Sequence, residues 1–142
     1  MKYLKDELYS RSKADEWRKA YARFEKEFLR IKHKFPKGFV AEMLENHAFH
    51  DSGIRRLTLE IAELDKEVLC IELGDGFDSR IMHTITLRGI SALNVNNVLW
   101  QDWLYAEILP QKKGQFSLEA AFSDKGSLYV EFKKLEYSIN NL

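Results

Sequence analysis

Cysteine is almost absent from this 142-residue chain. Cys70 is its single cysteine, so no disulfide can form within the chain, which favours a reducing compartment. The first residues alternate in charge and lack the apolar segment of a signal peptide. No uncharged apolar run is long enough to cross a bilayer. These absences predict a cytoplasmic protein that does not bind a membrane.

The short motifs of catalysis and cofactor binding are also missing. Gly74-Asp75-Gly76 is followed by acids and no lysine, so it is typical of a turn and not of a phosphate-binding loop. There is no Gly-x-Ser-x-Gly nucleophile motif. Cys70 lies in the most apolar segment, where a thiol usually fills the core. The sequence therefore predicts no cofactor and offers no coherent set of catalytic residues.

Charge is balanced overall but unevenly distributed. Residues 1–37 hold twelve Lys/Arg and six Asp/Glu, whereas residues 38–142 hold ten and sixteen. A basic first part and an acidic remainder could attract each other, or each could meet a separate partner.

Helical periodicity dominates the first third of the chain. Apolar residues recur there at steps of three or four: Trp17, Tyr21, Phe24, Phe28, Ile31 and Phe35. This stripe predicts an amphipathic helix that begins at a Ser12 N-cap, with Asp15 completing a capping box, and ends at Pro36. A coiled-coil seam would also fit, but the stripe is short and aromatic, so packing on the protein's own sheet is favoured. Shorter helices are expected over 3–9 and 39–46.

From residue 47 onward the period changes to two, which is typical of strands. Strands are predicted over 54–62, 68–73, 80–88, 103–109, 116–122 and 128–132, the last with an extension towards 139. Residues 63–66 are expected to form a hairpin turn, and residues 89–97 receive no assignment. Short links favour an antiparallel meander. The prediction is one α+β domain over 1–142, with amphipathic helices in 1–46 packed on a mostly antiparallel sheet of about six strands in 47–142.

The order of motifs resembles a known family. Lys2-Tyr3 precedes the aromatic helix, His50-Asp51-Ser52-x-Ile54 opens the first strand, and Trp103-Leu104-Tyr105-Ala106-Glu107-Ile108 precedes a final hairpin. This arrangement resembles an uncharacterised family of small bacterial proteins, described as a domain of unknown function, and its strand opening is similar to that of some small immunity-type proteins. The resemblance implies a bacterial origin and an α+β fold. It implies no activity and no catalytic residue.

The densest aromatic cluster is a candidate interaction site. Tryptophan and tyrosine next to carboxylates are typical of protein-binding hot spots. The alternative is that these side chains are core and edge aromatics. The candidate residues are Trp100, Asp102, Trp103, Tyr105 and Glu107.

Histidines and an aspartate at the helix-to-strand junction are a candidate metal site. Imidazole and carboxylate groups at this spacing could bind a divalent metal or act as acid and base. The alternative is that Asp51 caps the turn and His50 packs locally. The residues are His47, His50 and Asp51, joined through the fold by His83.

Five cations on the side of the long helix opposite the aromatic stripe are a candidate nucleic-acid site. Such a row could follow phosphates, but every amphipathic helix also needs a polar outer face. Glu16 and Glu27 project to the same side and dilute the charge. The residues are Lys19, Arg23, Lys26, Arg30 and Lys34.

The sequence favours a non-enzymatic protein-interaction or inhibitor module, of the immunity type, whose acidic sheet meets a basic protein partner. The motivation is the acidic balance of 38–142, the tryptophan cluster and the lack of a catalytic set. A metal- or small-ligand-dependent enzyme built on His50, Asp51 and His83 is the first alternative. Nucleic-acid binding by the basic helix face is the second and less favoured one.

Overall fold

The computed structural model describes residues 1–61, 63 and 66–141, apart from the side chain of His47. Its two α-helices are α1 (Ala14–Ile31) and α2 (Lys37–Leu44). Its strands are β1 (Gly53–Ile61), β2 (Glu67–Gly74), β3 (Ile81–Arg88), β4 (Ala92–Asn96), β5 (Trp103–Pro110), β6 (Phe116–Phe122), β7 (Ser127–Phe132) and β8 (Lys134–Asn141). Short 3₁₀ turns occur at Asp6–Leu8 (η1), Arg11–Lys13 (η2), Lys32–Lys34 (η3), His47–Phe49 (η4), Lys112–Gly114 (η5) and Ser123–Lys125 (η6).

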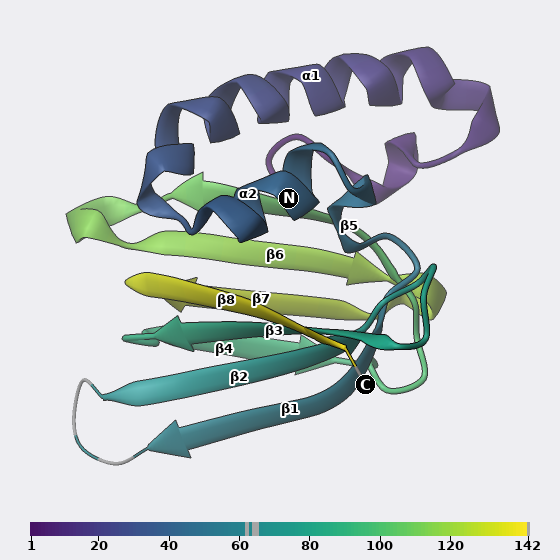
Figure 1. Ribbon diagram of the computed structural model, residues 1–142. Coiled ribbons are helices and arrows are strands. Elements are labelled where there is room, and N and C mark those ends of the chain that lie inside the picture. Colours follow the sequence, from purple (N-terminus) through teal and green to yellow (C-terminus); the bar gives the residue numbers. More distant parts are fainter. Residues whose placement is uncertain (62, 64–65, 142) are drawn as a thin grey trace.

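The described strands form two antiparallel sheets of four strands each. One has the order β1-β2-β3-β8 and the other the order β4-β7-β6-β5 (Figure 1). The predicted α+β class with antiparallel strands is confirmed. The expected single sheet of about six strands is wrong, because residues 89–97 contain β4 and residues 134–141 form a strand of their own. The expected hairpin turn at 63–66 lies partly outside the described residues.

A sharp corner joins the two sheets. The chain passes from β3 to β4 through residues 89–91, and from β7 to β8 through Lys133 alone. Pairing continues on both sides of the corner, with Arg88 opposite Lys134 and Ala92 opposite Glu131. The paired strands fold back on themselves, so the start of β3 and the end of β4 reach the same end of the molecule (Figure 1).

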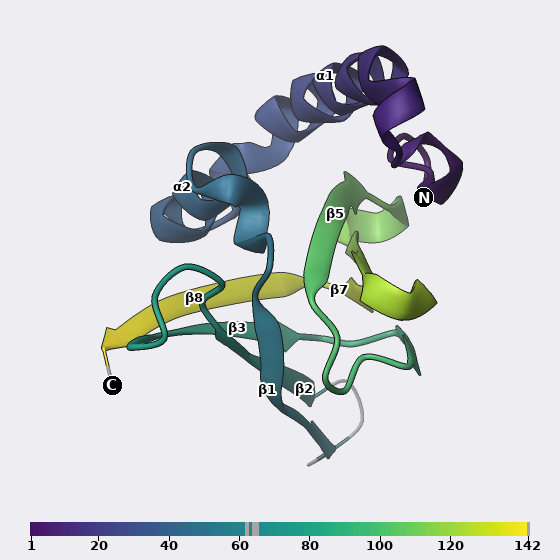
Figure 2. The ribbon, with the colours of Figure 1, turned by 90° about the vertical axis from the view of Figure 1, so that its right-hand side faces the viewer.

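The apolar faces of both sheets meet in one core. Alternate residues of β2, β3, β6 and β7 point inward and are buried, as strand geometry requires. The helices cover the same core, since α1 contacts the edge strand β5 and α2 contacts the edge strand β8 (Figure 2). Phe24 and Phe28 of the predicted stripe are buried, while Trp17, Tyr21 and Ile31 pack at its margin.

The helix ends differ from the sequence expectation. The N-cap of α1 is Lys13, which makes no side-chain capping bond, and Ser12 lies in the preceding 3₁₀ turn. The helix expected over 3–9 is reduced to the η1 turn, because the adjoining segment is held by bonds to β5 that are described below. Helix α2 starts directly after Pro36, a position that proline tolerates, and ends at Leu44 instead of 46. No described helix combines the length and apolar character needed to cross a membrane.

We predict that Gly89→Ala destabilises the protein by about 1–3 kcal/mol, because Gly89 has a φ of +70° and a Cβ there would lie 3.0 Å from Cβ of Lys133. Urea unfolding measures the change. Gly114→Ala is the matched control: its φ is +72°, but a Cβ would meet nothing within 4 Å. An equal loss of unfolding free energy in both variants would show that close packing of Gly89 against Lys133 does not contribute to stability.

Candidate binding site

Three connections meet at the end of the sheets opposite the corner (Figure 1). They are the residues between η4 and β1, the loop between β2 and β3, and the loop between β4 and β5. Together they enclose a hollow of 480 Å³ that is lined by Asp51, Gly53, Ile54, Arg55, Gly74, Asp75, Gly76, Leu99, Trp100, Gln101 and Asp102. We refer to it as the loop-end hollow.

Hydrogen bonds fix two of these connections, the residues before β1 and the end of the β4–β5 loop. The Asp51 amide donates to the Trp103 carbonyl at 2.8 Å, and the Trp103 amide donates to the Ser52 carbonyl at 2.8 Å. The Ser123 hydroxyl accepts from the Asp102 amide at 2.9 Å, and the Asp102 carbonyl accepts from the Ser123 amide at 2.9 Å. The backbone on this side of the hollow is therefore held in place by the fold.

Gly76 permits the β2–β3 loop to lie close to the residues before β1. A Cβ at this position would lie 2.6 Å from the carbonyl oxygen of His50 and 2.6 Å from the carbonyl carbon of Asp51. Both atoms belong to the backbone, which cannot move aside as a flexible side chain can. Glycine is thus required for the β2–β3 loop to reach the start of β1.

Trp100 is the most exposed large apolar side chain among the described residues at the rim of the hollow. Its fractional exposure is 94%, and the neighbouring Leu99 is 68% exposed. Trp100 also has a φ of +66°, which non-glycine residues adopt at an energetic cost. A tryptophan held in solvent on strained backbone is typical of a contact residue.

Carboxylates dominate the charge of the hollow. Asp51, Asp75 and Asp102 line it, and Arg55 is the one cation among its described lining residues. Asp78, in the same β2–β3 loop, pairs with Arg80 at 3.0 Å. The hollow is therefore suited to a basic group.

A chain of hydrogen bonds leads from the hollow into the core. Asp75 Oδ1 lies 2.7 Å from Nε2 of the buried His83, whose Nδ1 lies 2.6 Å from the Tyr137 hydroxyl. Both ring nitrogens of His83 and the hydroxyl of Tyr137 are therefore hydrogen-bonded. Oδ2 of Asp75 accepts the amides of Phe77 and Asp78 at 2.9 and 2.8 Å.

This chain sets the protonation of its acidic members. Burial acts to raise the pKa of Asp75, but the bonds from His83 and from two amides outweigh it, so the pKa lies below its usual value. Burial first, and then the charges of Glu42 and Asp75, raise the pKa of Tyr137. Asp75 is thus held as an anion while Tyr137 stays a neutral donor.

The structure divides the predicted interaction residues. Trp100 and Asp102 lie at the hollow, whereas Trp103, Tyr105 and Glu107 are 0%, 4% and 1% exposed. The three buried residues cannot contact a partner, because the edge strand β5 is covered on both of its faces. Sequence reasoning missed Asp75 and Leu99, although the turn at Gly74-Asp75-Gly76 marked the place of Asp75.

Glu107 has a structural role that the sequence did not indicate. Its carboxylate accepts the amides of Lys2 at 3.0 Å, of Tyr3 at 2.7 Å and of Leu4. Next to it, Tyr105 donates to Asp6 at 2.6 Å and packs against Trp17 with ring centroids 4.8 Å apart. These two residues attach the start of the chain to β5.

The described side chains of the predicted metal residues do not converge. His50 Nδ1 lies 2.9 Å from the Leu104 carbonyl, its Nε2 lies 3.5 Å from Asp51 Oδ1, and His83 engages Asp75 and Tyr137 instead. His47 lies in η4, and its side chain is outside the described residues. Among the groups that are described, no three His, Cys, Asp or Glu side chains gather in a way that could hold a metal.

The predicted basic face of α1 is on the surface. All five of its side chains are exposed, and none of them makes an ion pair within the described part of the chain: Lys19, Arg23, Lys26, Arg30 and Lys34. Glu27 is turned to the start of the chain, where it lies 3.5 Å from Lys2 Nζ and accepts from the Tyr3 hydroxyl.

Comparison with known proteins adds no relative. No protein-family model matches this chain, no curated protein matches it significantly, and no solved structure matches its fold significantly. A proposal about function therefore starts from the α+β architecture and the loop-end hollow.

We predict that Asp75→Asn lowers the free energy of unfolding at pH 7 by about 1–3 kcal/mol, since it weakens charge-assisted bonds to His83 and two amides. Because the pKa of Asp75 is depressed in the folded state, its contribution is complete above the ordinary aspartate pKa and is lost as pH falls through the folded value. The variant should therefore show a weaker acid dependence.

Urea titrations between about pH 7 and pH 2 measure both effects. Asp78→Asn is the control, since its carboxylate pairs with the exposed Arg80 and should cost little. A wild-type and an Asp75→Asn protein with parallel acid profiles would contradict the prediction.

Proposed function

We propose that this chain is a non-enzymatic protein-interaction or inhibitor module, of the immunity type, that binds a basic protein partner at the loop-end hollow. The observation that carries the proposal is Trp100, 94% exposed at the rim of a hollow that contains three carboxylates. The bacterial origin and cytoplasmic location expected from the sequence belong to the same proposal.

The chemistry of the hollow defines the partner's surface. Trp100 and Leu99 supply apolar area that gains free energy when water is removed from it. Asp51, Asp75 and Asp102 favour lysine or arginine around the tryptophan contact. The matching surface is an apolar recess with a basic rim.

The fixed geometry of the loops supports binding. The bonds between the Asp51 and Trp103 segments, and between Asp102 and Ser123, form within the chain itself. A partner therefore meets loops that are already ordered, and less conformational entropy is lost on association. The enzyme alternative has less support, because His83 is engaged in the core and does not join His50 and Asp51 in one described set.

The test begins with capture of the partner from a nuclease-treated bacterial lysate and continues with the purified pair in calorimetry. Trp100→Ala should weaken binding about tenfold or more, as loss of a hot-spot tryptophan does. Asp102→Asn should weaken it less and reduce its dependence on salt. Ile61→Ala is the control, because this side chain is 69% exposed at the other end of β1.

Equal affinities of the wild type and Trp100→Ala for the purified partner would contradict the proposal. So would a partner that binds with the same affinity at low and high salt. A capture that is lost on nuclease treatment would favour the second candidate instead.

Nucleic-acid binding is the second candidate function, favoured by the five exposed cations of the basic face, four in α1 and Lys34 in η3. We predict that a fluorescent single-stranded RNA binds with an affinity that falls steeply with salt, because counterions are released from its phosphates. Arg23→Glu with Lys26→Glu should abolish the anisotropy change, whereas Trp100→Ala should leave it intact. Equally weak RNA binding by the wild type and by the Arg23→Glu/Lys26→Glu variant would count against this candidate.

A further inference from the structure

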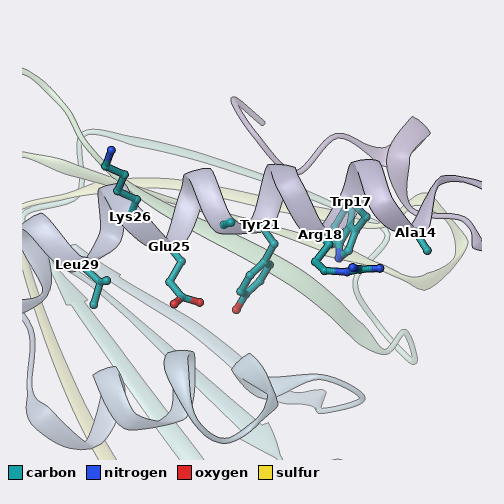
Figure 3. Close-up of a pocket in the computed structure, with 8 residues that line it drawn as sticks. Ala14, Trp17, Arg18, Tyr21, Glu25, Lys26 and Leu29 are labelled. Atoms are coloured by element: carbon teal, nitrogen blue, oxygen red, sulfur yellow. The ribbon is translucent and has the colours of Figure 1, made fainter.

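A second hollow lies along one side of α1 and is lined by residues of α1 alone. It has a volume of 720 Å³, and its side chains project from successive turns of the helix (Figure 3). The residues that matter below are Ala14, Arg18, Tyr21, Ala22, Glu25 and Leu29. We refer to them as the α1 side face.

This face differs from the two other faces of α1. It is separate from the core face of Phe24 and Phe28, and it adjoins the basic face. Leu29 is 43% exposed on it, and Ala14 and Ala22 are exposed as well. The small residues Ala14 and Ala22 leave room for the backbone of another helix to approach closely.

The charges of the α1 side face are complementary to themselves. In an antiparallel pair of α1 helices with a two-fold axis between residues 21 and 22, residues at the same height along the pair have numbers that add up to 43. Arg18 then lies opposite Glu25 of the partner copy, and the symmetry makes this ion pair twice. Within the described part of the monomer, Arg18 pairs only with the neighbouring Asp15, in an exposed pair at 2.7 Å.

The same symmetry matches the sizes of the side chains. Leu29 of each copy lies over Ala14 of the other, so a large side chain meets a small one at each end of the contact. Next to the axis the two Ala22 residues lie one residue's rise apart, about 1.5 Å along the helices, and the helices can approach there. Tyr21 lies beside it, with its hydroxyl 3.5 Å from the Met43 carbonyl.

We infer that the α1 side face binds a second copy of this chain, as an antiparallel α1–α1 pair with two-fold symmetry. The contact spans residues 14–29, about 22 Å of helix at 1.5 Å per residue. An interface of this length is small for a permanent dimer, so the dimer forms and dissociates with concentration. The inference does not depend on the loop-end hollow.

Sedimentation velocity from about 1 μM to about 1 mM tests the inference. The wild type should shift from monomer to dimer across this range. Arg18→Glu and Glu25→Arg should each weaken the dimer about tenfold or more, since like charges then face each other twice. The double variant R18E/E25R restores opposite charges and should dimerise like the wild type.

A cross-link locates the axis independently of charge. In a Cys70→Ser background, Ala22→Cys should form an intermolecular disulfide on mild oxidation, because the two copies of this position lie next to each other at the axis. Lys19→Cys in the same background is the control, as Lys19 is exposed on the basic face. A wild type that stays monomeric at every concentration, or a double variant that fails to regain dimerisation, overturns the inference.

Discussion

The corner between the two sheets is the constraint on which the rest of the structure depends. Lys133 donates its amide to the Arg88 carbonyl at 2.9 Å, and Gly89 donates to the Glu67 carbonyl at 3.1 Å. These bonds keep the strands paired while the chain changes sheet. The start of β3 and the end of β4 then lie at the same end of the molecule. The β2–β3 loop with Asp75 and the β4–β5 loop with Trp100 therefore meet there. The hollow is thus a consequence of how the sheets are joined.

A buried carboxylate has a comparable role for the helices. Glu107 accepts three amides from the start of the chain, which fixes where the chain enters α1. Since a buried anion is stable only when donors surround it, the first residues and β5 require each other. With its core face set by Phe24 and Phe28, α1 leaves its basic and side faces in solvent.

The sequence predicts what periodicity can encode. The α1 stripe follows from apolar spacings of three to four, and most of the strands follow from spacings of two. A spacing of two does not tell whether successive strands belong to one sheet or to two. One signal of the corner was present: the inward residues of β7 are even-numbered, from Leu128 to Phe132, whereas the buried residue of β8 is the odd-numbered Leu135. This change of phase, with Lys133 and Lys134 between, marks a change of sheet rather than an extended strand.

The candidate site shows the same limit. Aromatic density identified the segment around Trp100 and Asp102, but alternation could not tell that both faces of β5 are covered and that Trp103 and Glu107 serve the core. The charge asymmetry has a structural counterpart, since cations lie on α1 while carboxylates line the hollow. A basic partner of the kind proposed would be repelled by the first and attracted by the second, so the field of the whole molecule would orient it towards Trp100 before contact.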